Sequence, residues 1–357
     1  MGRVARRDGG SGRGAGPGRA GPPPYSGRAR WGAGLGALAL AVLAAAGCGS
    51  SPGTAGSGHP AGTADVAYAG SLAYLNEKFV GPAFARATGY AYQGRGAGSD
   101  ALSAEIAAGE ISPGVFISVG PGPITALEPK FTRWYIQYAA TSIVVAYNPH
   151  SKYASQFRAI AAGREPLRDL FTLMERPGFL LGRTDPNIDP QGRAFVYMLE
   201  LAQAAYHLPA GTVTRILRGP AASSSSSQIF DETSLDSHLQ AGQLDAASAF
   251  LSQAIQLHLP YIPLPPAINL GDAALAARYH TASITIAGNV TKHGEPLVLD
   301  ITLIGKPSPA ARAYVRFVLS PAGRELYSRR GGYALLTPTA SGDRAAIPAA
   351  IRGELGG

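Results

Sequence analysis

The chain has 357 residues and a formal net charge of +8, with 46% hydrophobic and 15% charged residues. This length and composition suit two globular domains, or one large α/β unit with a sizeable core. The positive charge is concentrated in the first 47 residues, where seven arginines face one acid, and the remainder holds 24 bases and 22 acids. That near balance leaves no basic patch of the kind that nucleic-acid binding requires.

The N-terminal segment has the composition of an export signal and takes no part in the predicted fold. Residues 1–30 are rich in Gly, Pro and Arg, and 31–46 form an apolar stretch that is shorter than a typical membrane span. Small residues precede Cys48, the only cysteine of the chain. This arrangement resembles the lipobox of bacterial lipoproteins, with an incidental cysteine after a plain signal peptide as the alternative.

The lipobox resemblance implies that residues 1–47 are a lipoprotein signal peptide and that 48–64 form a flexible tether. Two acyl chains on Cys48 would suffice for stable anchoring. We therefore expect the chain to be exported and held by its lipid at the outer face of the cytoplasmic membrane.

Strand and helix patterns alternate from Asp65 onward, which indicates an α/β fold with parallel sheets. The sequence predicts strands at 65–68, 90–93, 115–118, 141–147, 178–182, 282–287 and 297–303. It predicts helices at 72–87, 100–108, 153–162, 166–175, 191–206, 235–241, 309–319 and 322–330. Residues 243–251 are expected to lead back into a strand, and 261–266 to be extended.

Four polar residues lie beside predicted helix starts: Ser71, Ser99, Asp189 and Glu232. Each one alone is explained as a helix cap or as an acid favoured by the helix dipole. In an open α/β sheet, however, the turns after the strands converge at one edge, where ligands bind. Helix N-termini there present free N–H groups to an anion. The four residues together therefore predict an anion-binding cleft.

No catalytic constellation is present in the sequence. It contains no Gly-x-Ser-x-Gly elbow and no Walker loop, its histidines do not cluster, and Gly94–Gly98 has the wrong spacing for a dinucleotide fingerprint. His280 and His293 are expected at the surface. Four aromatic residues are expected in the core rather than in a stacking box: Phe131, Trp134, Tyr135 and Tyr138.

Seven segments support a family resemblance through their order along the chain: 69–72, 96–99, 143–147, 184–193, 239–245, 261–265 and 319–323. Together they resemble the molybdate/tungstate-binding lipoproteins of ABC importers, and within that family the archaeal-type branch. The resemblance covers residues 66 to about 340. It implies a two-lobed α/β clamshell of the type II periplasmic binding proteins, each lobe a mostly parallel sheet flanked by helices.

The resemblance also implies the lobes, the ligand and the partners. Lobe 1 would hold 66–146 plus 283–357, and lobe 2 would hold 147–282. Ser71, Ser99, Asp189 and Glu232 would bind molybdate or tungstate, and the two acids would complete a six-coordinate Mo or W. The chain would be a monomer without catalytic residues or a cofactor, working with the permease and ATPase of an importer.

Two departures and two alternatives accompany this interpretation. Phe250 stands where the family commonly has a tyrosine, and the region between 206 and 231, directly before Glu232, is shorter than in the family and serine-rich. The site could instead take phosphate, with Asp189 accepting its proton. An exported hydrolase could use Asp189 and Glu232 as an acid/base pair. Three basic residues near the loops are expected to be structural or at the rim: Arg95, Arg183 and Arg193.

Overall fold

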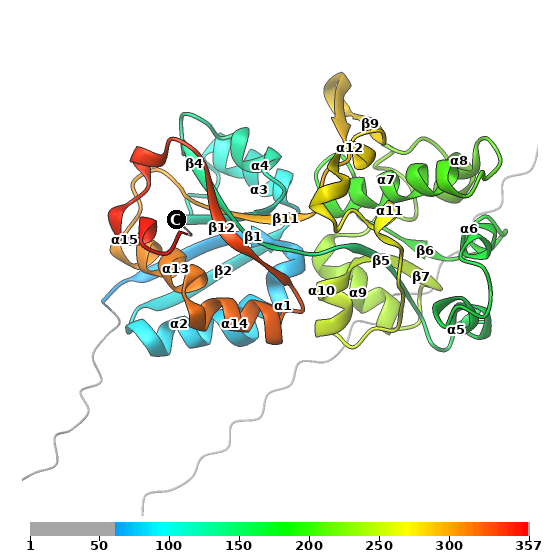
Figure 1. The fold of residues 1–357 in the computed structure, drawn as a ribbon, viewed down its shortest axis with the longest axis horizontal. Coiled ribbons are helices and arrows are strands. Elements are labelled where there is room, and N and C mark those ends of the chain that lie inside the picture. The colour runs from blue at the N-terminus through cyan, green and yellow to red at the C-terminus, as the bar shows by residue number, and fades with distance from the viewer. Residues whose placement is uncertain (1–60, 356–357) are drawn as a thin grey trace, which may run out of the picture. The chain divides into compact units, whose positions relative to one another are not determined.

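A computed structural model describes residues 61–355 and builds them around two main β-sheets and a two-stranded ribbon (Figure 1). The strands are β1 (Thr63–Ala69), β2 (Ala91–Ala97), β3 (Val115–Val119), β4 (Trp134–Ala140), β5 (Ile143–Tyr147), β6 (Leu181–Gly182), β7 (Ala246–Phe250), β8 (Tyr261–Ile262), β9 (Ser283–Ile286), β10 (Val290–His293), β11 (Val298–Leu303) and β12 (Ala334–Gly342). The six-stranded sheet has the order β12-β4-β11-β3-β1-β2, the four-stranded sheet the order β6-β7-β5-β8, and β9 pairs with β10.

Helices connect most of the strands. They are α1 (Ala73–Leu75), α2 (Gly81–Thr88), α3 (Ser99–Ala108), α4 (Gly122–Thr125), α5 (Ala154–Ala161), α6 (Arg168–Met174), α7 (Pro190–Ala205), α8 (Thr212–Leu217), α9 (Glu232–Gln240), α10 (Leu251–Gln256), α11 (Pro266–Asn269), α12 (Ala276–Tyr279), α13 (Pro309–Leu319), α14 (Pro321–Arg329) and α15 (Ala349–Arg352). A 3-10 turn at Gly70–Leu72 and a π-helical turn at Asn76–Val80 join α1 and α2 into one helical run. None of the helices between residues 61 and 355 has both the length and the apolar character needed to cross a membrane.

The strand directions correct one expectation. In the six-stranded sheet β1 runs parallel to β2 and β3, whereas β11 is antiparallel to β3 and β4, and β12 is antiparallel to β4. In the four-stranded sheet only β6 and β7 are parallel. The α/β class is confirmed, but both sheets are mixed rather than mostly parallel. In the six-stranded sheet β11 and β12 run opposite to β4, and in the four-stranded sheet β7 and β8 run opposite to β5.

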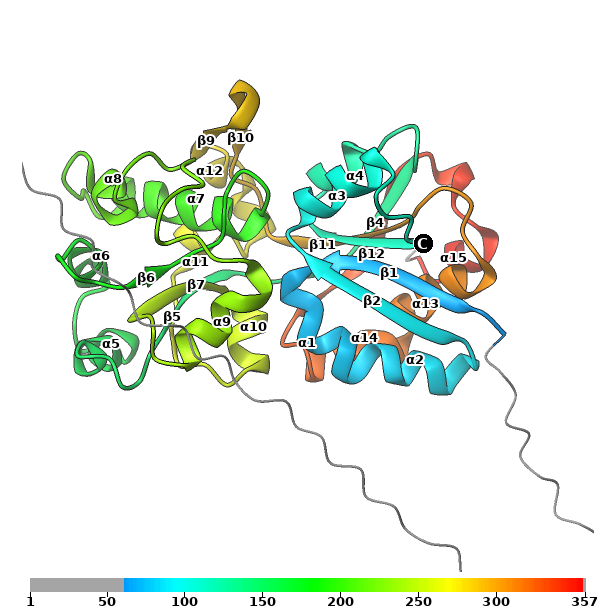
Figure 2. The ribbon, with the colours of Figure 1, turned by 180° about the vertical axis from the view of Figure 1, so that it is seen from behind.

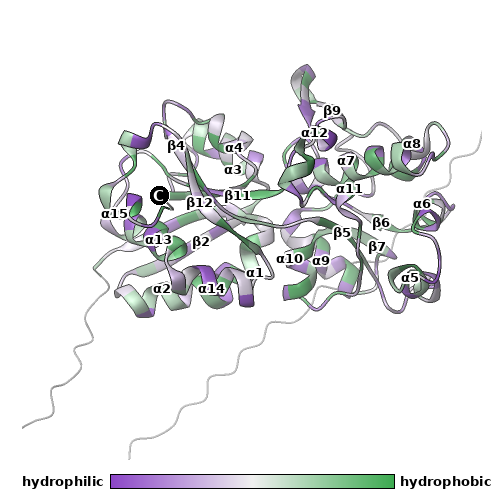
Figure 3. Ribbon diagram, in the orientation of Figure 1, coloured by the Kyte–Doolittle hydropathy of each residue, from purple (hydrophilic) through white to green (hydrophobic). Residues whose placement is uncertain are grey.

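At the centre of the six-stranded sheet, side chains on both faces of β1 are buried. In β1, Val66 and Tyr68 belong to the main core cluster, whereas Ala67 packs on the other face with Phe116 of β3 and Leu102 of α3. Figures 1 and 2 show α2, α13 and α14 together on one face of this sheet and α3 and α4 on the other. Helix α14 shows hydrophilic turns in Figure 3, as expected of a helix with one face in water.

The chain passes between the two sheets at neighbouring segments. One segment joins β4 to β5, and another leads into β11; the Thr141 N–H donates to the Leu297 carbonyl over 2.9 Å. Strand β5 pairs with β7 and β8 in the four-stranded sheet. Residues 143–146, expected in the first lobe, thus pair with strands of the four-stranded sheet and not with the six-stranded sheet. The division of the rest of the chain into two lobes stays a prediction.

The sequence predicted most of the elements, but three strands were missed. Helix α7 follows its predicted range within one residue, whereas the strand expected at 178–182 shortens to Leu181–Gly182. Strands β4, β10 and β12 were not predicted as strands, and the four aromatic residues expected in the core lie in or just before β4. Trp134 and Tyr138 of that group are buried, which confirms their core position.

Candidate functional site

The four residues singled out from the sequence all lie at helix starts. Ser71 is the central residue of the turn Gly70–Leu72, Ser99 is the first residue of α3, Asp189 immediately precedes α7, and Glu232 is the first residue of α9. Each of the four residues is at most 5% exposed. Free N–H groups at such helix starts, together with the helix dipole, favour an anion.

Only one of these residues is the helix cap that its position suggested. The Asp189 carboxylate accepts a hydrogen bond from the Gln191 N–H at 2.8 Å and so caps α7. The two serines do not cap, because their helices begin one residue or more earlier than predicted, and Ala69 and Gly98 occupy the N-cap positions. The Ser99 hydroxyl instead accepts from the Val119 N–H at 3.3 Å.

A glycine before each serine makes room for one of the acids. A Cβ added at Gly70 would lie 2.6 Å from the Glu232 Oε2 atom. A Cβ added at Gly98 would lie 2.7 Å from the Ile188 carbonyl oxygen and 3.3 Å from the Asp189 Cβ. Close approach of backbone to a neighbouring group is the usual reason for glycine at such positions. The structure therefore brings Ser71 next to Glu232 and the turn of Ser99 next to Asp189.

The two acids interact electrostatically inside the protein. Burial raises the pKa of Asp189 to about 7, against smaller opposing effects of the Gln191 N–H and the Arg193 charge. Burial, and then the charge of Asp189, raise the pKa of Glu232 well above its ordinary value, while the N–H of Ser71 lowers it. Two carboxylates that share a buried site disfavour each other's charged form.

Several buried polar atoms around these acids have no hydrogen-bond partner among residues 61–355. They are Ser71 Oγ, Thr184 Oγ1, Glu232 Oε2 and Tyr333 Oη. Thr184 faces Asp189 and lowers its pKa slightly. Buried polar groups are nearly always paired, so a group of unpaired ones at one place is an unusual feature that needs an explanation. The sequence drew no attention to the side chains of Thr184 and Tyr333, because neither lies at a helix start.

Glutamine side chains hold the start of α7 in place. Gln191 Nε2 donates to Gln253 Oε1 at 2.5 Å, and the Ser248 hydroxyl donates to Gln191 Oε1 at 3.2 Å. Gln253 Oε1 also accepts from the Phe250 N–H at 3.0 Å. Phe250 therefore takes part through its backbone, and its ring is fully buried. The network fixes the backbone that carries Asp189.

The three nearby arginines all have protein partners. Arg193 pairs with Asp100 of α3 at 2.5 Å and also donates to the Pro186 carbonyl. Arg183 is buried and donates weakly to Gln228 Oε1 at 3.4 Å, and exposed Arg95 pairs with Glu105 at 2.8 Å. These contacts agree with the expectation that the arginines are structural.

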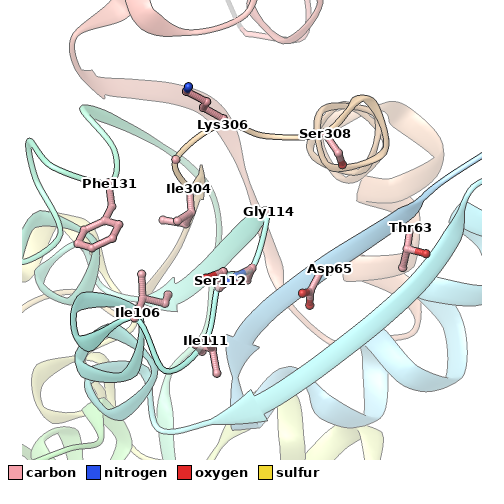
Figure 4. Close-up of a pocket in the computed structure, with 13 residues that line it drawn as sticks. Thr63, Asp65, Ile106, Ile111, Ser112, Gly114, Phe131, Ile304, Lys306 and Ser308 are labelled. Carbon is pink, nitrogen blue, oxygen red and sulfur yellow. The ribbon is translucent and has the colours of Figure 1, made fainter.

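Other features give no competing site. His280 and His293 stack on each other and are exposed, and the described part of the chain contains no group of three or more His, Cys, Asp or Glu suited to a metal ion. A cavity of about 450 Å³ has Ile106, Phe131 and Ile304 on one side and Asp65 of β1 on the other (Figure 4). It lies where β1 and β3 begin, whereas Ser71 and Ser99 follow the ends of β1 and β2.

Cys48, predicted as the lipidation site, and the predicted signal peptide 1–47 lie outside the residues that the structure describes.

Comparison with known protein families gives one match that spans most of the chain. Residues 64–333 match the family described as bacterial extracellular solute-binding protein. A putative ABC transporter molybdenum-binding protein of Haloferax volcanii is 32% identical over 260 residues, which cover 72% of this chain and 78% of the relative. A molybdate/tungstate-binding protein of Pyrococcus abyssi is 29% identical over 244 residues, covering 63% and 68% of the two chains.

Comparison with solved structures supports the predicted fold. A periplasmic molybdate-binding protein of Azotobacter vinelandii aligns with a TM-score of 0.50 at 18% identity, covering 76% of this chain and 98% of the other. At this identity the likeness concerns the fold alone. It confirms the predicted architecture, that of a periplasmic binding protein.

Proposed function

The chain belongs to the bacterial extracellular solute-binding proteins, and from this premise we propose that it captures molybdate or tungstate and delivers it to an ABC importer. One observation carries the choice of ligand. Two buried acids, Asp189 and Glu232, meet at helix starts that otherwise favour an anion. The names of the relatives from Haloferax volcanii and Pyrococcus abyssi agree with that choice.

The helix starts and hydroxyls account for binding of an oxyanion. The backbone N–H groups of Gly70 and Ser71 lie near the Glu232 carboxyl, and α7 and α3 begin close to Asp189. These groups are neutral donors, and such donors at helix starts are suited to an anion. The charge of Arg193 acts on Asp189, but its guanidinium is paired with Asp100. The Ser71 hydroxyl, which has no partner within residues 61–355, would donate to a ligand oxygen.

The two acids account for the selection among oxyanions. A carboxylate facing a dianion at about 4 Å costs on the order of 4 kcal/mol per charge pair near a protein surface. The sulfur of sulfate stays four-coordinate, so sulfate has no way to relieve this repulsion. Mo(VI) and W(VI) can accept further hard oxygen ligands, and Asp189 and Glu232 would then become ligands of the metal. Repulsion would thus exclude sulfate.

Phosphate remains the second candidate, because the raised pKa of Asp189 suits a carboxyl that shares a proton with its ligand. The exported hydrolase is set aside. The family consists of solute-binding proteins, which confirms the prediction that the chain is not an enzyme.

The delivery step and the anchor are part of the same proposal. A diacylated Cys48 would hold the monomeric chain at the outer face of the cytoplasmic membrane, beside the permease and its ATPase. Replacing Cys48 by alanine should abolish metabolic labelling with palmitate. Unchanged labelling of the Cys48→Ala protein would refute the anchor.

Titration calorimetry of the purified protein with molybdate, tungstate, sulfate and phosphate tests the ligand. The proposal expects tight binding of molybdate or tungstate and at least a hundredfold weaker binding of sulfate, equivalent to about 2.7 kcal/mol. Preferred binding of phosphate would favour the second candidate. The absence of heat with all four ions would contradict both.

A further inference from the structure

Tyr333 lies in a tight turn that aims its side chain into the protein. It follows Gly331 and Gly332 between α14 and β12, and it is 3% exposed. Gly332 has a φ of +69°, and Gln256 Nε2 donates to the Gly331 carbonyl at 2.9 Å. The Tyr333 N–H donates to the Tyr327 carbonyl at 3.1 Å. The backbone on both sides is therefore fixed, and the ring has a defined direction.

The Tyr333 hydroxyl lies beside the proposed oxyanion site. Burial raises the pKa of Tyr333, and the negative charge of Glu232 raises it further. The hydroxyls of Ser252 and Ser71 lie near the Tyr333 hydroxyl and lower its pKa, but by less than burial raises it. None of these groups, nor any other described residue, forms a well-aligned hydrogen bond with the hydroxyl. The phenol remains protonated at neutral pH and has a proton to donate.

Ser71 Oγ and Glu232 Oε2, which have no hydrogen-bond partner among the described residues, are also close to this position. The three groups come from three separate elements: the turn after β1, the start of α9, and the turn before β12. Two of them are hydroxyls that can donate, and a bound oxyanion offers oxygens that accept. A single ligand oxygen near Ser71 would satisfy both donors.

We propose that Tyr333 is a further ligand-contacting residue, which donates its hydroxyl proton to an oxygen of the bound oxyanion together with Ser71. This inference rests on the proposed function, because the ligand is the same oxyanion. It adds a contact from the last part of the six-stranded sheet to those of the four residues predicted from the sequence.

The neighbouring Tyr327 provides a matched control. It is also fully buried, and its hydroxyl also has no well-aligned partner within residues 61–355, but its ring packs edge-on against Tyr138 and its hydroxyl faces that residue. Tyr327→Phe therefore removes a comparable hydroxyl outside the site. Calorimetry with molybdate on wild type, Tyr333→Phe and Tyr327→Phe then separates a ligand contact from a structural hydroxyl.

We expect Tyr333→Phe to weaken molybdate binding about tenfold, or about 1.4 kcal/mol, with the melting temperature of the ligand-free protein unchanged or raised. Tyr327→Phe should bind within twofold of wild type. In the Ser71→Ala background the Tyr333→Phe effect should shrink, since the two hydroxyls share one oxygen. Unchanged affinity of Tyr333→Phe, or an equal loss in Tyr327→Phe, would overturn the inference.

A structure of the wild-type protein with molybdate supplies a test that needs no variant. The inference expects the Tyr333 Oη atom within hydrogen-bond distance of a ligand oxygen. A wild-type protein that binds no molybdate would count against the proposed function. Molybdate bound with Tyr333 Oη beyond reach would count against this inference alone.

Discussion

At Asp189 and Glu232 two acids share a buried site: burial raises the pKa of both, and the charge of Asp189 raises the pKa of Glu232 further. An isolated helix cap would not need a second acid beside it. A centre that can accept both carboxylates as ligands removes the repulsion between them. The two residues are therefore interpreted as a pair, and substitutions should reveal their shared role.

Asp189→Ala and Glu232→Ala should each weaken molybdate binding by more than about tenfold, or 1.4 kcal/mol, because a metal–oxygen bond is lost. Discrimination against sulfate should fall as well, because a repulsive charge has gone. The double variant should lose less than the sum of the two effects. Calorimetry with molybdate and sulfate measures all three quantities.

Asp231→Ala is the control for these variants, because Asp231 is an exposed acid next to Glu232 that makes no side-chain cap bond. It should leave affinity unchanged. If Asp189 were only a cap, its loss would cost about 1 kcal/mol of stability and leave the preference for molybdate over sulfate intact. That outcome would refute ligation by Asp189.

The same pair predicts how the stability of the ligand-free protein depends on pH. The folded-state pKa of Asp189 is about 7, above the unfolded value of about 3.9, so the native protein binds more protons between these values. Stability should therefore be highest at acidic pH and should fall as pH rises through about 7. Asp300, whose pKa burial raises to about 8, acts in the same direction.

Melting curves from pH 5 to 8 on wild type and on the Asp189→Asn, Glu232→Gln double variant isolate the contribution of the pair. The wild-type melting temperature should decline more steeply with pH than that of the variant. Parallel profiles would show that the pKa values of the two acids are not raised in the ligand-free protein.

At the scale of elements, an ion pair links helix α7 to helix α3. The Arg193 and Asp100 side chains are 9% and 22% exposed and lie 2.5 Å apart. A second link joins α3 to the loop before α7, since the Ala101 N–H donates to the Ile188 carbonyl at 3.2 Å. These contacts hold the start of α3 against the loop that carries Asp189.

Arg193→Gln should lower the free energy of unfolding by about 2 kcal/mol, because it leaves Asp100 without its partner in a largely buried place. Molybdate affinity should change less than about tenfold, since Arg193 contacts protein groups. Arg95→Gln, which breaks an exposed pair with Glu105, should cost less than about 1 kcal/mol. Denaturant unfolding of the two variants compares them directly; equal losses would contradict the role given to the buried pair.

The sequence predicted those elements whose signal is local. The apolar face of 191–206 predicted α7 within one residue, and the β-branched run predicted as a strand at 141–147 contains β5, which begins two residues later. Strand β12 was missed because its buried and exposed residues do not alternate regularly, and it is a strand only because it pairs with β4. The antiparallel direction of β11 depends on the path of the whole chain and cannot be predicted from a local sequence pattern.

The site was predictable where a helix start marked it and not elsewhere. Ser71, Ser99, Asp189 and Glu232 could be named from their positions at helix starts. The sequence alone did not show why Gly70 and Gly98 are glycines, because the residues that they approach are distant in the sequence. Tyr333 lies more than 100 residues from Glu232 in sequence, and its turn has no signature that indicates a ligand. Long-range packing therefore decided the part of the site that the sequence did not show.

At the scale of the whole molecule, the proposed ligand contacts come from both main sheets. Ser71 and Ser99 follow strands of the six-stranded sheet, and Asp189 and Glu232 lie at the starts of helices that pack on the four-stranded sheet. A ligand that needs contacts from both favours the closed arrangement, because only that arrangement makes all of them. Small-angle scattering should show a smaller radius of gyration after molybdate is added; an unchanged radius would contradict closure of two lobes on the ligand.

X-ray absorption spectroscopy on the protein loaded with molybdate or tungstate tests the central claim most directly, because it counts the oxygens around the metal. If Asp189 and Glu232 are ligands, the spectrum should show four short metal–oxygen distances and two longer ones, and the two longer ones should disappear in the Asp189→Ala, Glu232→Ala double variant. A purely tetrahedral shell of four oxygens in the wild-type complex would contradict ligation by either carboxylate.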